Sequence, residues 1–197
     1  MGMGTEFELK YRATAQQLAG VRRDLSGEEQ KIKMQTQYYD TPSGALSARR
    51  CTLRRRMENG VSICTLKYPV SGPGRGEIEV ACDALEDALP ELCRQSGLEE
   101  LPGLLQEGLV PVCGARFTRI AKTVLWQGAV LELALDEGVL TGGGKEEPFC
   151  EIEVELKDGP EEAVLHCGAF LQAAYGFIPE GKSKFRRARD LRLREGD

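Results

Sequence analysis

The stretch Glu6-Phe7-Glu8-Leu9-Lys10 places charged side chains at even positions and apolar side chains at odd positions. A period of two is typical of a β-strand with one charged and one apolar face. This strand sets two carboxylates two residues apart and follows them with a lysine. Two carboxylates so placed can share a divalent cation, although a half-solvated strand of an antiparallel sheet shows the same alternation.

The same pattern recurs along the chain. Glu77-Ile78-Glu79-Val80 repeats the alternation, and Glu151-Ile152-Glu153-Val154-Glu155-Leu156-Lys157 restates the opening stretch almost residue by residue. This recurrence favours a shared function of the charged faces over three unrelated surface strands.

Composition limits the class of protein. The 197 residues, 41% hydrophobic and 29% charged, fit a single globular domain over residues 1–197. No apolar run approaches the roughly 20 residues of a transmembrane helix, and the N-terminus lacks a signal-peptide pattern, so we expect a cytoplasmic protein without a membrane partner. The net charge of −5 argues against a nucleic-acid partner bound by overall charge.

The usual nucleophile and zinc patterns are missing. Seven cysteines lack any Cys-x-x-Cys spacing, which argues against a disulfide framework and against a zinc site. The single histidine, His166, lies in a run that reads as a helix, so Ser-His-Asp or Cys-His catalysis is poorly supported.

The pattern predicts about eight mostly antiparallel strands with helices as connectors, an α+β architecture. An Asn-Gly turn at Asn59-Gly60 joins two of the strands in a hairpin. We expect a bulge between Arg116 and Arg119 and a loop over Glu137–Glu147. The predicted strands that follow the first are Lys31–Tyr39, Cys51–Met57, Val61–Tyr68, Glu77–Val80, Val110–Trp126, Ala129–Asp136 and Glu151–Lys157, and the predicted helices are Ala13–Ser26, Asp83–Ser96 and Pro160–Tyr175.

Several strands share an almost wholly ionic face, which suggests a barrel turned inside out. Its lumen would be charged, and its apolar outer face would be covered by helices and would favour a homodimer. A charged lumen is costly unless its charges are paired or meet a ligand, so we expect a polyanion bound together with metal ions. The cations that would bind phosphate oxygens are Lys10, Arg54, Arg56, Lys67, Arg116, Arg119 and Lys184.

Paired carboxylates offer the oxygen ligands that Mg²⁺ or Mn²⁺ prefers. Phosphoryl transfer needs positioning, charge neutralisation and an oriented water, so it requires no His or Ser nucleophile.

Glu6-x-Glu8-x-Lys10 resembles the ExExK motif of the CYTH superfamily, the triphosphate tunnel metalloenzymes. Further matches follow in the family's order and cover nearly the whole chain: Tyr39-Asp40-Thr41-Pro42, Leu53-Arg54-Arg55-Arg56, Thr65-Leu66-Lys67, Glu77-Ile78-Glu79, Glu132–Gly138, Glu151–Lys157 and Ser183-Lys184. An isolated ExExK motif is weak evidence for the family, but the whole set of motifs in this order is specific for it.

The resemblance implies a closed antiparallel tunnel of eight strands and divalent-metal-dependent hydrolysis of a triphosphate. By position it implies metal ligands at Glu6, Glu8, Asp136, Glu153 and Glu155, with Glu151 less certain. It implies catalytic roles for Glu6, Glu8 and Lys67, and phosphate contacts from Lys10, Arg54, Arg56, Lys67, Arg119 and Lys184. Whether Arg116 or Arg119 points inward depends on the expected bulge.

Inorganic triphosphate is the leading substrate. A thiamine or nucleoside triphosphatase would use the same tunnel but needs an apolar mouth, for which Trp126 or Tyr68 could serve. Class IV adenylate cyclases share the fold, yet the His-Phe pair that they tend to carry just upstream of ExExK is missing here. A non-catalytic module that binds polyphosphate or an organic phosphate is the alternative from a different class.

Overall fold

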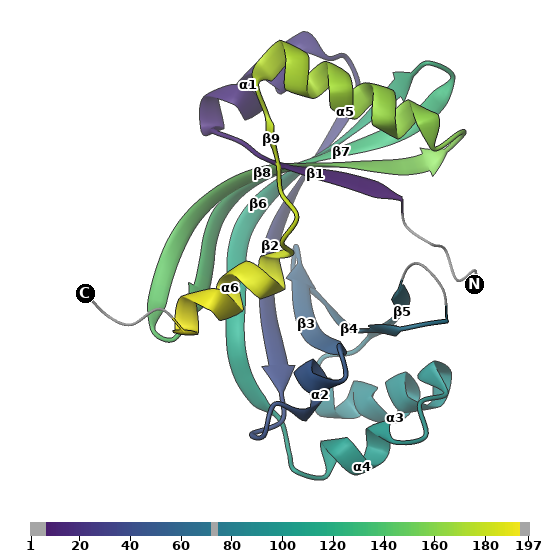
Figure 1. Cartoon of the computed structure of the whole chain (residues 1–197), viewed down its shortest axis with the longest axis vertical. Coiled ribbons are helices and arrows are strands. Elements are labelled where there is room, and N and C mark those ends of the chain that lie inside the picture. The colour runs from purple at the N-terminus through teal and green to yellow at the C-terminus, as the bar shows by residue number, and fades with distance from the viewer. Residues whose placement is uncertain (1–6, 72–74, 194–197) are drawn as a thin grey trace.

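The structure is a computed structural model that describes residues 7–71 and 75–193. Nine antiparallel strands form one curled sheet in the order β5-β4-β3-β2-β6-β7-β8-β1-β9 (Figure 1). The strands are β1 (Glu8–Arg12), β2 (Glu28–Asp40), β3 (Thr52–Glu58), β4 (Val61–Pro69), β5 (Arg75–Ala81), β6 (Val110–Trp126), β7 (Ala129–Gly142), β8 (Lys145–Asp158) and β9 (Ile178–Pro179). The predicted α+β class is confirmed.

In the part of the chain that the structure describes, six helices accompany the sheet: α1 (Ala15–Asp24), α2 (Ala45–Ala48), α3 (Leu85–Ser96), α4 (Leu101–Leu105), α5 (Glu162–Tyr175) and α6 (Lys184–Leu193). In Figure 1, α1 and α5 cover the convex side of the sheet at one end, and α3 and α4 cover it at the other. No helix among the described residues is long and apolar enough to cross a membrane. The seven cysteines all lie within these residues and are free thiols.

The prediction of a closed eight-stranded barrel is wrong. Within the described residues the sheet has nine strands, and its two ends, β5 and β9, are not hydrogen-bonded to each other. The outer edge of β1 pairs with the short β9, through Tyr11 with Pro179 and Arg12 with Ile178. Within the described residues, β9 thus occupies part of this edge and β5 pairs with β4 alone, so the sheet forms an open trough.

As predicted, successive side chains along each strand lie on alternate faces of the sheet. On the convex side, one apolar cluster joins β1, β7 and β8 to α1 and α5, and a second joins β3, β4 and β5 to α2, α3 and α4. A third cluster lies on the concave side, where Ala188 and Leu191 of α6 pack against Phe117 and Leu140. Helix α6 therefore covers one end of the trough, and the remaining concave surface is left to charged residues.

The predicted loop over Glu137–Glu147 is instead the tip of a long β7–β8 hairpin. Gly143 and Gly144 form its turn with positive φ angles of 59° and 76°, the conformation that two-residue hairpin turns favour. Gly142 belongs to strand β7, and α6 lies so close to it that a Cβ there would be 2.1 Å from the carbonyl oxygen of Ala188. The glycines thus serve close packing as well as the turn.

The expected bulge between Arg116 and Arg119 is also absent from the structure described. Strand β6 pairs in continuous register with β7 from Cys113 to Trp126, and its pairing with β2 shifts only at Tyr38/Tyr39. Residues three apart on a regular strand point to opposite faces, so Arg116 and Arg119 lie on opposite sides of the sheet.

The Asp40-Thr41 pair has a structural role. The buried Asp40 carboxylate accepts hydrogen bonds from the backbone N–H groups of Thr41, Leu46 and Ser47, at 2.8, 2.9 and 3.2 Å. These bonds fix the turn that leads from β2 into α2, which accounts for this part of the motif without any role in catalysis.

An ion-paired lysine holds α1 to the convex face of the sheet. A capping box of Thr14 and Gln17 starts α1, and the buried Lys122 of β6 pairs with Glu29 at 2.9 Å. Glu29 also receives hydrogen bonds from Arg22 of α1. The bonds from Arg22 and then from Lys122 lower the pKa of Glu29 to about 2.

This pairing predicts a stability that depends on pH. Because the pKa of Glu29 is lower in the folded than in the unfolded chain, its contribution is complete above the unfolded value of about 4.3 and is lost as the pH falls toward 2. We expect Glu29→Gln to lower the free energy of unfolding by about 1–2 kcal/mol at pH 7, since Lys122 loses a charged partner. Urea unfolding at pH 7, 5 and 3 should show that this deficit, the difference in the free energy of unfolding between the parent protein and Glu29→Gln, shrinks between pH 5 and 3.

Glu28→Gln is the matched control, because Glu28 is the exposed neighbour of Glu29. A deficit for Glu29→Gln that stays constant down to pH 3 would contradict the assignment.

Candidate functional site

The concave face of the trough surrounds a cavity of about 520 Å³. Three groups of side chains line it. Strands β1, β7 and β8 contribute an acidic wall of Glu8, Glu132, Glu153 and Glu155; strands β3, β4 and β5 contribute an arginine wall of Arg54, Arg56, Arg75 and Lys67; and between the walls, strands β2 and β6 contribute a floor of Ile32, Met34, Phe117 and Ala121. The strands that carry the two walls, β1, β7 and β8 on one side and β3, β4 and β5 on the other, lie across the trough from each other in Figure 1.

Strand register builds the acidic wall. Glu8 of β1 lies opposite Glu155 of β8, which in turn lies opposite Glu132 of β7. Directly opposed residues have Cβ atoms about 5 Å apart, so the three carboxylates form one row across three strands. Two cations lie beside this row: Lys157, at 2.8 Å from Glu155 and 3.7 Å from Glu132, and Lys10, at 3.8 Å from Glu8.

The arginine wall is incompletely paired. Arg54 reaches Glu77 and Glu79 only at 3.4 and 3.6 Å, and its buried Nε atom has no hydrogen-bond partner among the described residues. Arg56 reaches Glu79 at 3.4 Å, and its Nε atom lies 2.5 Å from Glu58. Burial and then the charge of Arg54 lower the pKa of Arg56. Two adjacent guanidinium groups, one of them with a buried donor that lacks a partner, therefore favour an anionic ligand.

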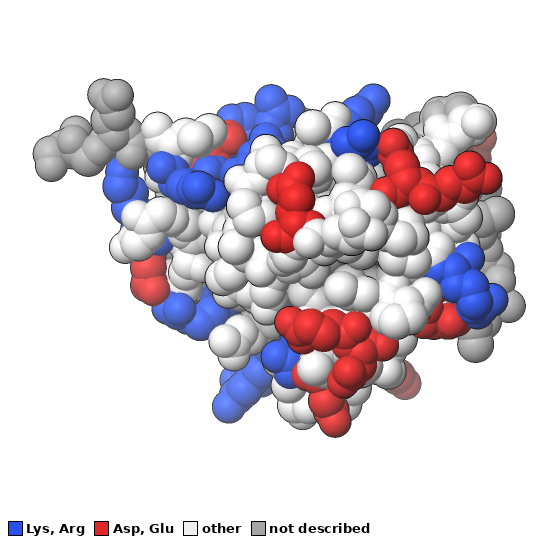
Figure 2. Space-filling view, turned by 90° about the horizontal axis from the view of Figure 1, so that it is seen from below, with Lys and Arg blue, Asp and Glu red and all other residues white. Residues whose placement is uncertain are grey.

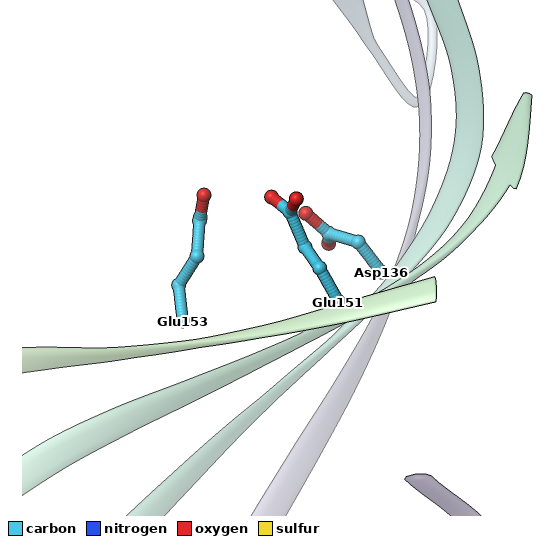
Figure 3. A group of neighbouring side chains, drawn as sticks. All are labelled: Asp136, Glu151 and Glu153. Atoms are coloured by element: carbon cyan, nitrogen blue, oxygen red, sulfur yellow. The ribbon is translucent and has the colours of Figure 1, made fainter. Parts of the chain in front are cut away.

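Behind the acidic wall lies a buried carboxylate cluster of Asp136, Glu151 and Glu153 (Figure 3), in which one oxygen from each residue lies within 4.8 Å of the others. Three cations neutralise it. Arg119 donates to Asp136 with both Nε and Nη2 at 2.8 Å and to Glu153 at 2.7 Å. Lys184 contacts all three carboxylates, at 2.8 Å from Asp136 and 3.0 Å from Glu153, and Arg187 lies 2.6 Å from Glu151.

Pairing overcomes burial at two members of this cluster. Burial raises the pKa of Glu153, but the charges of Lys184 and Arg119 outweigh it and hold that pKa well below its usual range. Burial likewise lowers the pKa of Lys184, and the three carboxylates raise it above its ordinary value. At Glu151 burial is the larger effect and raises the pKa. The cluster thus pairs three carboxyl groups with three basic side chains.

The buried carboxylate cluster and the Glu8–Glu155–Glu132 row differ in how well they suit a divalent cation. Both oxygens of Asp136 and of Glu153 are engaged by Arg119 and Lys184, so an ion among the cluster would have to displace Lys184. Glu8 and Glu155 face the cavity with fewer counter-cations, and carboxylate oxygens are the ligands that Mg²⁺ and Mn²⁺ prefer. The Glu8–Glu155–Glu132 row is therefore the better candidate for a metal.

The structure brings most of the predicted site residues together. The cavity is lined by Glu8, Lys10, Arg54, Arg56, Lys67, Arg119, Glu153, Glu155 and Lys184. Glu6 lies outside the described residues. Asp136 is fully buried behind the wall, and Arg116 lies on the outer face, paired with Glu146 at 2.6 Å. Of these two arginines, Arg119 is the one that lines the cavity.

Some lining residues escaped the sequence analysis. Arg75 lines the arginine wall and donates to the carbonyl oxygens of Arg50 and Lys67 at 2.6 and 3.1 Å. Its position two residues before Glu77 on the same strand was the available signal. Arg187 had no such signal, because the Arg-rich C-terminal segment was not predicted as the helix α6.

Comparisons with known proteins agree with this geometry. Residues 4–188 match the family model of the CYTH domain. An inorganic triphosphatase from Haemophilus influenzae is 32% identical over 135 residues, which are 67% of this chain and 38% of that protein, so the chain spans well under half of that relative.

Two solved structures share the fold. One is the PH1819 protein from Pyrococcus horikoshii (TM-score 0.64, 24% identity, 94% of this chain and 99% of that one). The other is HpAC1 from Hippeastrum, described as a putative adenylyl cyclase with a dominant triphosphatase activity (TM-score 0.66, 20% identity, 94% and 95%).

The charge balance of the buried carboxylate cluster predicts that Lys184 stabilises the fold. Lys184→Met would leave three buried carboxylates facing two cations, and we expect the free energy of unfolding to fall by about 3–5 kcal/mol. Lys182→Met, which removes an exposed lysine paired with Asp190, should change it by less than about 0.5 kcal/mol. Chemical denaturation at pH 7 measures both, and equal losses would contradict the assignment.

Proposed function

The chain belongs to the CYTH domain family, and we propose that it hydrolyses a triphosphate in the presence of Mg²⁺ or Mn²⁺, with inorganic triphosphate as the preferred substrate. The relative named as an inorganic triphosphatase supports this choice of reaction.

One observation carries the proposal: the adjacent guanidinium groups of Arg54 and Arg56 face a wall of carboxylates across a cavity. Among the described residues, the buried Nε atom of Arg54 has no hydrogen-bond partner. A ligand that satisfies both sides is a polyanion with a divalent cation. The guanidinium groups would hold the anion, and the carboxylates would hold the cation.

The two walls of the cavity have different roles in this proposal. Arg54, Arg56, Lys67 and Lys10 would hold phosphate oxygens, with Arg119 and Lys184 at the acidic side. Glu8 and Glu155, together with Glu132 and the predicted Glu6, would hold the cation, which supplies charge neutralisation and Lewis acidity when bound. The chain's own contribution is to align the triphosphate and to concentrate positive charge where negative charge develops at the leaving group.

A triphosphate with an organic group is the second candidate. Neither residue considered for an apolar mouth lines the cavity: Trp126 packs on Phe170, with ring centroids 4.9 Å apart, and Tyr68 is buried in the convex cluster under α3. The floor residues Ile32, Met34 and Phe117 do line it. They give an apolar surface on which a thiamine or nucleoside group can lie.

A substrate panel tests the proposed function. We expect phosphate release from inorganic triphosphate with Mg²⁺ or Mn²⁺ to exceed that from ATP or thiamine triphosphate under the same conditions. Faster release from an organic triphosphate would favour the second candidate. Formation of cyclic AMP from ATP would indicate a cyclase, and binding without release would indicate a non-catalytic module.

Substitution of Glu8 tests the acidic wall. We expect Glu8→Gln to lower kcat for triphosphate about 10²–10³-fold, the loss that follows removal of one preorganised group from a site of charge stabilisation. Glu146→Gln is the matched control, because Glu146 lies on the outer face with Arg116. Circular dichroism would verify folding, and turnover by Glu8→Gln within threefold of the parent protein would rule out this role.

A further inference from the structure

Arg187 lies behind the cavity and does not belong to its lining. Its side chain is 11% exposed, and its Nη1 atom lies 2.6 Å from Oε2 of Glu151. The guanidinium also stacks over the ring of Phe149, 5.4 Å from the centroid. Arg187 is therefore held on two sides, with its charge directed at the buried carboxylate cluster.

Glu151 connects Arg187 to the cavity. It is fully buried, and its two oxygens are divided between two cations: Oε1 accepts from Lys184, and Oε2 accepts from Arg187. Lys184, in contrast, lines the cavity and is the first residue of α6. Glu151 thus contacts both Arg187 and Lys184, and Lys184 is the cation that can reach the ligand.

The charges explain why Arg187 is needed. Asp136, Glu151 and Glu153 balance Arg119, Lys184 and Arg187. Without Arg187 only two cations of the cluster face three carboxylates, and Lys184 is then the one remaining cation in contact with the buried Glu151 among the described residues. The ammonium would then be drawn toward Glu151 and away from the phosphate side of the cavity.

We propose that Arg187 is a positioning residue, which holds Glu151 from behind so that Lys184 can present its ammonium group to the ligand in the cavity. The inference rests on the proposed function, because it concerns the affinity of the same site for a triphosphate.

The test compares Arg187→Gln, Arg187→Lys, Glu151→Gln and the double variant Glu151→Gln/Arg187→Gln. Steady-state hydrolysis of inorganic triphosphate gives kcat and KM, and calorimetry without divalent cation gives Kd. The matched control is Arg189→Gln: Arg189 lies on the same helix and stacks on Phe185, but its Nη1 atom donates a hydrogen bond to Ser47.

We expect Arg187→Gln to raise KM and Kd by about tenfold while kcat changes by less than about threefold, since a contact made equally in ground and transition states affects binding alone. Arg187→Lys should recover most of the affinity, and Arg189→Gln should leave it unchanged. The double variant, in which two anions face two cations, should bind no worse than Glu151→Gln, because coupled residues give non-additive losses.

Two results would overturn the inference. A fall in kcat with unchanged KM and Kd would mean that Arg187→Gln only reduces the amount of folded enzyme, and additive losses in the double variant would mean that Arg187 does not act through Glu151. If Arg187→Gln does not fold, the comparison of the double variant with Glu151→Gln decides. If the parent protein binds triphosphate without hydrolysing it, the proposed function falls and the Kd series still decides this inference.

Discussion

Mutual neutralisation of three buried carboxylates by three cations is the interaction on which the rest of the structure depends. Arg119 comes from β6, Asp136 from β7, Glu151 and Glu153 from β8, and Lys184 and Arg187 from α6. An isolated charge at any of these positions would be expensive to bury, whereas the complete set is compatible with a dry interior. The cluster therefore fastens α6 to the sheet, and through α6 it closes one end of the trough.

The alternation of charged and apolar residues made the orientation of the sheet predictable. Once Glu8, Arg54 and Glu153 are placed on strands, the period of two assigns all of them to one face, and the amphipathic helices leave only the other face for the apolar side chains. The ordered motifs indicated the chemistry of that face. Family resemblance, however, implied a closed ring, and β9 was too short, at two residues, to be recognised as the strand that occupies the edge of β1.

Other features depended on tertiary contacts that leave a weak local pattern. Gly142 looks like part of a loop in the sequence, yet it is a strand residue whose lack of a side chain lets α6 pack against it. Residues 184–193 read as a charged tail, since the apolar contacts of α6 are few and its buried Lys184 and Arg187 look like solvent-exposed residues until Glu151 is placed beside them. Whether Arg116 or Arg119 faces the ligand was undecided until pairing with β7 showed an unbroken register.

The outer surface has the opposite character to the arginine wall. Seen from the side of α3 and α4, the surface carries several groups of acidic side chains, with basic side chains mainly toward its edges (Figure 2). The segment 83–107 that forms this side carries seven acidic residues and one arginine. The acidic residues of this segment disfavour the approach of a polyanion from this side. A small phosphorylated ligand can enter the trough, but a large nucleic acid would meet this negative surface.

The open seam between β5 and β1 has a mechanical consequence. In a closed barrel the strand number and shear fix the diameter, but a curled sheet with free ends can change its width through a slight change of twist. A ligand held by the arginine wall on one side and by the acidic wall on the other would cross-link the two ends and take the place of the missing interstrand bonds. The width of the trough then becomes a property of the complex, and the resistance of the sheet to unfolding rises with the concentration of its ligand.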